Sequence, residues 1–292
     1  MQQFVQLLVA GLATGAIYAL VAVGFMLIWQ TSQTINFAQG EFVMVPAFFA
    51  LAAMKFGGLS FWPALLVALI VSALLLGLVF KRLLVDPMLK HGVLPLVIST
   101  VALSIFIKDA VKEFYAADAQ PFPVLWTSDD ISVFGMAVSA QSLVILAVAI
   151  VVVTALQLFL GHTRLGRCMQ ATAQNPAVAR ILGIPVERMI LLTFLINAGL
   201  VAVASFLISP IYLAKFTNGE TLGMAAFIAA IVGGFNQVRG AIAGGLILGV
   251  LDNLAAVYVS TQYRGAIPLF LLIFVILFRP EGLFGRATER TV

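Results

Sequence analysis

The chain has 292 residues, of which 62% are hydrophobic and only 10% are charged. About a quarter of the residues of a soluble domain are charged, so the composition excludes a soluble globular protein and indicates a polytopic membrane protein. The net charge of +4 comes from Lys and Arg residues scattered between apolar segments. Because they form no basic stripe with interleaved aromatic residues, they do not indicate nucleic-acid binding.

Nine apolar segments follow one another along the chain, and a helix needs about 20 apolar residues to cross the hydrocarbon core. They lie at 4–29, 42–54, 61–80, 94–107, 142–160, 190–213, 222–232, 241–259 and 266–278. The second and the seventh are short for a crossing. We therefore expect an all-α transmembrane bundle, a single transmembrane domain over 1–292, with eight or nine membrane segments, some of them short or broken.

A polar stretch separates the first two apolar segments. If the second segment lies in the membrane, Asn36, Gln39 and Glu41 lie at membrane depth, as in a broken or re-entrant helix that lines a cavity. The eighth segment carries Asp252 and Asn253. An ionisable residue in the bilayer faces a cavity or a partner because its charge is costly there. These five residues are candidates for a polar pathway, and the alternative is that Glu41 lies near a helix start and Asp252 pairs within the bundle.

Asn197 is the isolated amide of the sixth apolar segment. We expect it to form a hydrogen bond between two helices, since polar side chains of membrane helices commonly pair in this way.

Three groups of basic residues set the expected orientation, because short cytoplasmic loops carry an excess of Lys and Arg. They are Lys81, Arg82 and Lys90, then Arg164, Arg167, Arg180 and Arg188 in the segment at about 161–189, then Arg279, Arg286 and Arg290. With all three groups inside, the loop at about 108–130 is external and the C-terminus is cytoplasmic. The side of the N-terminus depends on whether the second segment crosses or re-enters.

Glycines recur at the four-residue spacing that lets two helix backbones approach closely. The pairs are Gly11 with Gly15, Gly240 with Gly244, and Gly245 with Gly249. Because glycines are grouped at 233–249, the eighth helix is the stronger candidate for close contact within the bundle or with a partner.

The sequence contains no GxxxxGK[ST] phosphate loop, no HExxH and no GxSxG motif. Its one cysteine, Cys168, and its two histidines, His91 and His162, have no metal-ligand spacing. We therefore expect no catalytic residues, no cofactor, no metal site and no enzymatic activity.

The basic segment at 161–189 contains the signature of a short helix. Asn175 is a good N-cap, and Pro176 suits the first helical position. Gly183 suits the end of the helix.

The same short helix presents one apolar stripe, because Val178, Ile181 and Leu182 lie at i, i+3 and i+4. Such a helix is too short to bury this face by itself. It either lies along the membrane interface or docks on a partner subunit, and we favour the second interpretation.

Six short sequences in the chain resemble the permease subunits of branched-chain amino acid ABC importers of the LivH type. They are GAIYAL at 15–20, INFAQGE at 35–41, TRLGR at 163–167, ARILGI at 179–184, VGG at 232–234 and FRPEGLFG at 278–285. The similarity runs over nearly the whole chain. Gln39 stands where His is frequent in the family, and the turn at 235–240 is less rich in Gly and Ser than is usual.

This resemblance implies a half-transporter of the cell inner (plasma) membrane that imports branched-chain or related amino acids. Its partners would be a second, identical or homologous permease, two separate ATP-binding subunits and an extracytoplasmic substrate-binding protein. The segment from Asn175 to Gly183, with Arg180 in it, would be the coupling helix. Related permeases move urea, short amides or other amino acids.

The alternative class is an ion-coupled secondary transporter or channel with Glu41 or Asp252 as its ion site.

Overall fold

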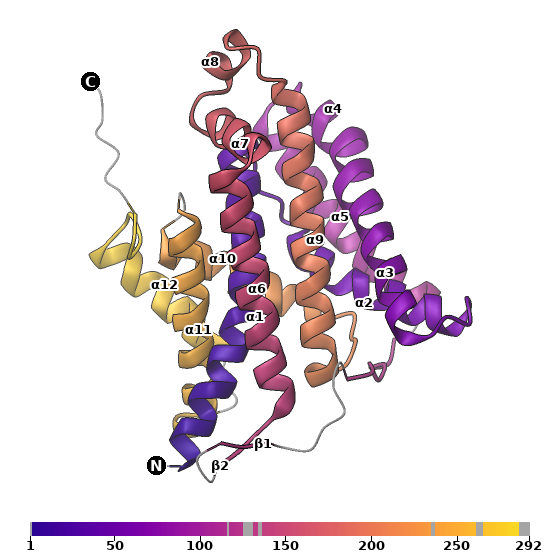
Figure 1. The fold of residues 1–292 in the computed structure, drawn as a ribbon, viewed down its shortest axis with the longest axis vertical. Coiled ribbons are helices and arrows are strands. Elements are labelled where there is room, and N and C mark those ends of the chain that lie inside the picture. Colours follow the sequence, from indigo (N-terminus) through magenta and orange to yellow (C-terminus); the bar gives the residue numbers. More distant parts are fainter. Residues whose placement is uncertain are drawn as a thin grey trace. The chain divides into compact units, whose positions relative to one another are not determined.

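A computed structural model describes residues 2–115, 117–124, 131–133, 136–234, 237–260 and 265–285 (Figure 1). All nine predicted apolar segments are helical, which confirms the predicted fold class. Their helices are α1 (Gln2–Ser32), α2 (Gln39–Lys55), α3 (Phe61–Ser72), α5 (Val93–Phe114), α6 (Ala140–His162), α9 (Val186–Tyr212), α10 (Asn218–Gly233), α11 (Val238–Tyr258) and α12 (Ala266–Phe278).

Six helical stretches in the described part of the chain are long and apolar enough to cross a membrane. They are Gln3–Ser32, Phe61–Leu89, Val93–Phe114, Ala140–His162, Val186–Tyr212 and Val238–Tyr258. α10 and α12 are shorter apolar helices, and α2 has 17 residues. Between α1 and α2 the chain is not helical, and its Asn36 is 3% exposed. The predicted break before the second segment is therefore present.

The third helix continues past the point at which we expected it to end. After α3 it runs on through two π-helical segments, η1 (Ala73–Val79) and η2 (Lys81–Val85), into α4 (Asp86–Leu89). The expectation that Lys81 and Arg82 lie in a loop is therefore wrong. Lys81 is 5% exposed and is tolerated inside the fold because carboxylates neutralise its charge.

The basic segment contains an unpredicted helix, α7 (Arg164–Gln174), before the predicted short helix α8 (Pro176–Ile181). α7 begins where the Thr163 hydroxyl accepts a hydrogen bond of 2.9 Å from the Gly166 backbone N–H. Gly166 lies against the backbone of α6, since a Cβ there would come within 2.6 Å of the Leu160 Cα. The chain therefore folds back at the end of α6 at a position that only glycine fits.

The segment that we expected at about 108–130 begins later, because α5 extends to Phe114. A short antiparallel hairpin follows, β1 (Ile131–Val133) paired with β2 (Met136–Val138), which was not predicted. Asp129, Asp130, Arg286, Arg290 and residues 235–236 lie outside the described residues.

The chain divides into two compact units. The first comprises Met1–Met26, Trp126–Ala149 and Met224–Val292, and the second comprises Leu27–Leu125 and Ile150–Gly223. Helices α1, α6 and α10 each contribute residues to both units.

The first unit is organised around the predicted glycines of α1 and α11. A Cβ at Gly15 would lie 2.8 Å from the Gly245 carbonyl oxygen, and one at Gly11 would lie 2.8 Å from the Val250 Cα. Gly244 approaches α10 in the same way, with Gly233 N 2.8 Å from its added Cβ. The prediction of close backbone packing is confirmed, and van der Waals contact between these backbones is a main source of helix association in lipid.

The second unit has a core built by α2, α3 and α9. Met44, Phe48, Leu65 and Phe206 are among its buried members, and the rings of Phe122 and Phe206 stack 6.5 Å apart. Pro46 interrupts the hydrogen-bond ladder inside α2, and there the Ala47 N–H donates to the Ser205 hydroxyl of α9 at 3.1 Å.

Candidate functional site

α8 begins as the sequence predicts. The Asn175 side-chain oxygen accepts hydrogen bonds from the backbone N–H groups of Ala177 at 3.0 Å and Val178 at 3.1 Å. Pro176 occupies the first turn, where its missing N–H has no helical partner to lose. The start of this short helix is therefore set by local interactions.

The end of α8 also follows the prediction. Gly183 has φ of +79°, a left-handed conformation that favours glycine. Its N–H donates to the Arg180 carbonyl at 3.1 Å, and the Ile184 N–H reaches back to the Ala179 carbonyl at 3.0 Å. These bonds satisfy carbonyls that the end of a helix leaves without partners.

The apolar stripe of α8 is exposed. Val178 is 49% exposed, Ile181 85% and Leu182 71%, whereas Ala179 on the other side of the helix is 1% exposed. In Figure 1, α8 lies at the top of the view, above α7. The capped helix thus presents large apolar side chains that the described part of the chain does not cover.

A second group of candidate residues lies buried in the second unit. The amides of Gln39 on α2 and Asn197 on α9 are both 0% exposed and bond each other reciprocally, at 2.6 Å and 3.0 Å. Asn36 donates to the same Gln39 oxygen at 3.5 Å, and its own oxygen accepts from the Ala38 N–H at 3.0 Å. The predicted interhelical role of Asn197 is confirmed.

This amide pair gives a stability prediction. Asn197→Leu leaves the NH2 group of the buried Gln39 amide without its acceptor, so we expect a loss of about 1–3 kcal/mol in the free energy of unfolding. The double variant Gln39→Leu/Asn197→Leu removes both polar groups and should lose less than the sum of the two single variants. Denaturant titration in detergent measures these differences.

The matched control is Asn253→Leu, because the Asn253 side chain bonds only within its own helix, to the Gly249 carbonyl at 3.0 Å, among the described contacts. An Asn197→Leu variant as stable as Asn253→Leu would contradict the importance of the pair.

Glu41 lies two residues after Gln39 on α2 and is 4% exposed. Its Oε1 accepts from the Ser104 hydroxyl of α5 at 3.1 Å, and its Oε2 accepts no hydrogen bond from the described residues. The carboxylate lies against Gly219, where an added Cβ would come within 2.9 Å of its Cδ. A side chain larger than hydrogen at position 219 would therefore displace Glu41.

α5 contributes a polar stripe that was not predicted from the sequence. The Thr100 hydroxyl accepts from the Phe37 N–H at 3.3 Å, Ser104 bonds Glu41, and Lys108 pairs with Glu220 at 2.8 Å. The signal was available in the sequence, since Thr100, Ser104 and Lys108 are spaced by four residues and so share one helix face.

The remaining candidates lie in the first unit. Asp252 is 4% exposed, and its Oδ2 accepts from the Tyr18 hydroxyl at 3.2 Å. The structure therefore brings Asn36, Gln39 and Glu41 together in the second unit and places Asp252 and Asn253 in the first.

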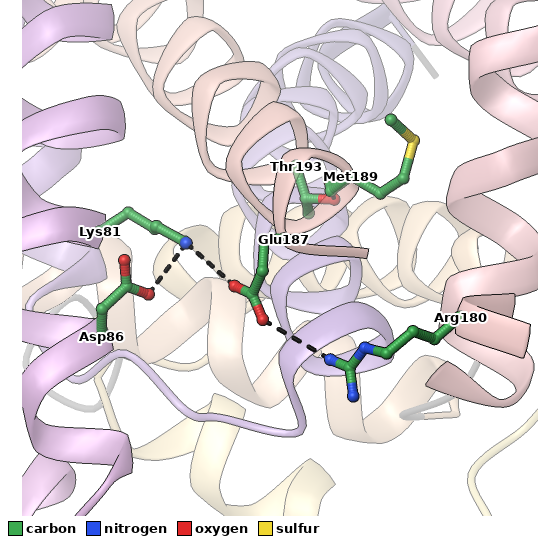
Figure 2. A network of polar contacts seen from close by, with 6 residues as sticks. All are labelled: Lys81, Asp86, Arg180, Glu187, Met189 and Thr193. Atoms are coloured by element: carbon green, nitrogen blue, oxygen red, sulfur yellow. Dashed lines mark hydrogen bonds and ion pairs between the residues drawn. The ribbon is translucent and has the colours of Figure 1, made fainter. Parts of the chain in front are cut away.

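A network of charged residues, also missed from the sequence, lies close to α8 (Figure 2). Lys81 Nζ is 2.9 Å from Asp86 Oδ1 and 3.4 Å from Glu187 Oε2. Glu187 Oε1 lies 3.7 Å from Arg180 of α8. Charge spacing along the chain could not reveal it, because Glu187 and Lys81 are far apart in sequence.

No group of three or more His, Cys, Asp or Glu side chains in the described ranges could hold a metal ion. Cys168 is a free thiol.

The fold and these sites define a multi-pass helical membrane protein that carries a short, capped helix with an exposed apolar face. The chain belongs to the family of permease components of the branched-chain amino acid transport system, whose model matches residues 7–276. It is therefore a transport subunit, not an enzyme.

Curated relatives from the same family match this chain over nearly its full length. The high-affinity branched-chain amino acid transport system permease protein BraD of Pseudomonas aeruginosa is 33% identical over 295 residues, covering 97% of this chain and 96% of the relative. The corresponding protein LivH of Escherichia coli (strain K12) is 32% identical over 295 residues, with the same coverages of 97% and 96%. A probable LivH of Methanocaldococcus jannaschii is 28% identical over 280 residues, and the alignment covers 91% of this chain and 88% of that protein. The resemblance seen in the sequence is confirmed.

Proposed function

We propose that this chain forms the membrane pathway of an ATP-driven importer of branched-chain amino acids, in which separate subunits hydrolyse ATP. The exposed apolar face of α8 is the observation that carries the proposal. An ATP-driven transport subunit that has no phosphate loop needs ATP hydrolysis on another chain, and α8 offers that chain a surface.

Several features of α8 support docking. Ile181 and Leu182 are mostly exposed, and burial of such side chains contributes about 1.5–3 kcal/mol each. The Asn175 cap and the Gly183 end set the helix conformation before a partner arrives, which lowers the ordering cost of binding. A helix laid into an apolar groove is a common mode of recognition.

The proposed assembly follows the family. The segment at about 161–189 lies in the cytoplasm with the C-terminus, the loop expected at about 108–130, which begins only after α5, faces outside, and the chain lies in the inner (plasma) membrane as a single permease domain. It pairs with a second permease, identical or related, and with two ATP-binding subunits. An extracytoplasmic binding protein delivers the substrate.

The buried polar cluster is the proposed pathway in this chain. Its Asn36, Gln39 and Glu41 side chains offer neutral amides and one carboxylate, groups that complement a zwitterionic amino acid. In the present conformation Gln39 is bonded to Asn197, so we expect this pair to separate when the pathway opens.

The deciding experiment is uptake of labelled leucine into proteoliposomes that hold the complete complex with its binding protein. We expect uptake to need ATP and to be competed by isoleucine and valine. Competition by urea or acetamide alone would reassign the substrate. Uptake driven by a sodium or proton gradient without ATP would overturn the proposal in favour of an ion-coupled transporter, with Glu41 or Asp252 as the ion site.

A further inference from the structure

Lys81 is a buried cation at which separate helical segments meet. Its side chain is 6% exposed, whereas those of its partners Asp86 and Glu187 are 36% and 70% exposed. A buried lysine without carboxylate partners would be strongly destabilising, so Lys81 is held where both carboxylates can reach it.

A π-helical turn brings Lys81 and Asp86 together. The Asp86 N–H donates to the Lys81 carbonyl, the i→i+5 bond that defines this kind of turn. In an α-helix, which advances about 100° per residue, side chains five residues apart would point about 140° away from each other. The π-helical segment η2 therefore builds the first half of the site, and such turns often occur at functional positions.

Glu187 builds the second half from the first turn of α9. One carboxylate oxygen faces Lys81 at 3.4 Å, and the other faces Arg180 of α8 at 3.7 Å (Figure 2). Asp86, Lys81, Glu187 and Arg180 thus form a row of alternating charges that runs from α4 and η2 through α9 to α8.

The helices at the buried end of this row pack directly on each other. A Cβ at Gly77 of η1 would lie 3.1 Å from the Leu195 Cα of α9, and the rings of Phe80 and Phe194 are 5.9 Å apart. A displacement at Glu187 therefore acts on α9 and, through Lys81, on the π-helical part of the third helix.

We propose that Lys81 is a positioning residue for energy coupling, which links α8 through Glu187 to the π-helical end of the third helix and to α9. The inference rests on the proposed docking of α8 on an ATP-binding subunit. Arg180 and Glu187 are exposed, and an exposed ion pair is weak by itself. The buried member of the row is Lys81, and its contacts with Asp86 and Glu187 hold Glu187 in place beside α8.

The test uses the complete complex in proteoliposomes and measures leucine uptake per ATP hydrolysed. Lys81→Met removes the charge and keeps an unbranched side chain that is one atom shorter, and we expect this ratio to fall by about tenfold, as loss of a coupling free energy predicts. Binding of the ATP-binding subunits and hydrolysis of ATP should persist. Lys81→Arg keeps the charge and should stay within about twofold of the wild type.

Two further variants make the result specific. Lys90→Met removes an exposed lysine after the same helix and should leave the ratio unchanged. Glu187→Gln removes a mostly exposed carboxylate, so it should fold normally and lower the ratio as Lys81→Met does.

A wild-type ratio in Lys81→Met, or equal losses in Lys81→Met and Lys90→Met, would overturn the inference. If Lys81→Met does not fold, a wild-type ratio in Glu187→Gln would overturn it. These failures differ from failure of the proposed function, in which the wild-type complex itself shows no ATP-dependent uptake or does not bind ATP-binding subunits.

Discussion

Ile181→Asp with Leu182→Asp should strongly weaken association of this chain with the ATP-binding subunits that we propose as its partners. The two side chains are 85% and 71% exposed, so the change leaves the fold of this chain intact. In the complex, however, it removes two apolar contacts worth about 1.5–3 kcal/mol each and forces two carboxylates to lose water. We expect affinity to fall by at least about a hundredfold. Co-purification from detergent and the ATPase rate of the purified complex measure the effect.

The matched control is Leu165→Asp on α7, where the replaced leucine is 50% exposed but lies outside the stripe of α8. It should retain association. If the double α8 variant remains bound and coupled, the docking role is refuted, and the alternative that α8 lies along the membrane interface gains support.

The second large effect concerns the packing of α1 against α11. Gly249→Val should destabilise the protein by about 3 kcal/mol, at the upper end of the usual cost of overpacking. A Cβ at this position would overlap the backbone of Gly15 and lie 2.6 Å from the Gly11 carbonyl oxygen. Since the obstacle is backbone, no rotation of a side chain relieves it. The free energy of unfolding in detergent or bicelles is the measurement.

Gly199→Val is the control for this prediction. Gly199 is also a helical glycine, on α9, but nothing lies within 4 Å of a Cβ added there. It should change the free energy of unfolding by less than about 1 kcal/mol, the scale of a helix-propensity difference. Similar losses in both variants would show that the α1–α11 contact is not the cause.

Local chemistry explains the predictions that the structure confirms. Runs of apolar residues gave the membrane helices, because a backbone in lipid must satisfy its own hydrogen bonds and so becomes helical. Asn175, Pro176 and Gly183 predicted the bounds of α8, because caps act on the residues next to them in the chain. The four-residue glycine spacing in α1 and α11 predicted close approach of helix backbones, because glycines four residues apart lie on the same face of a helix.

The errors arose where a distant residue changes the outcome. Lys81 was assigned to a loop because a charge usually ends an apolar helix, but Glu187, more than a hundred residues later, helps to neutralise it. Gly166 gave no local sign of the turn that starts α7, since its small size matters only against the backbone at Leu160.

Composition, helix periodicity and capping residues were thus sufficient for the class of protein, its apolar helices and the bounds of α8. Each of these depends on interactions within a few turns of one chain segment. The pairing of Gln39 with Asn197, the contact of Glu41 with Ser104 and the charge row at Lys81 required the tertiary structure. The reason is that a buried polar group is stabilised only by whichever partner the packing of helices brings within hydrogen-bonding distance.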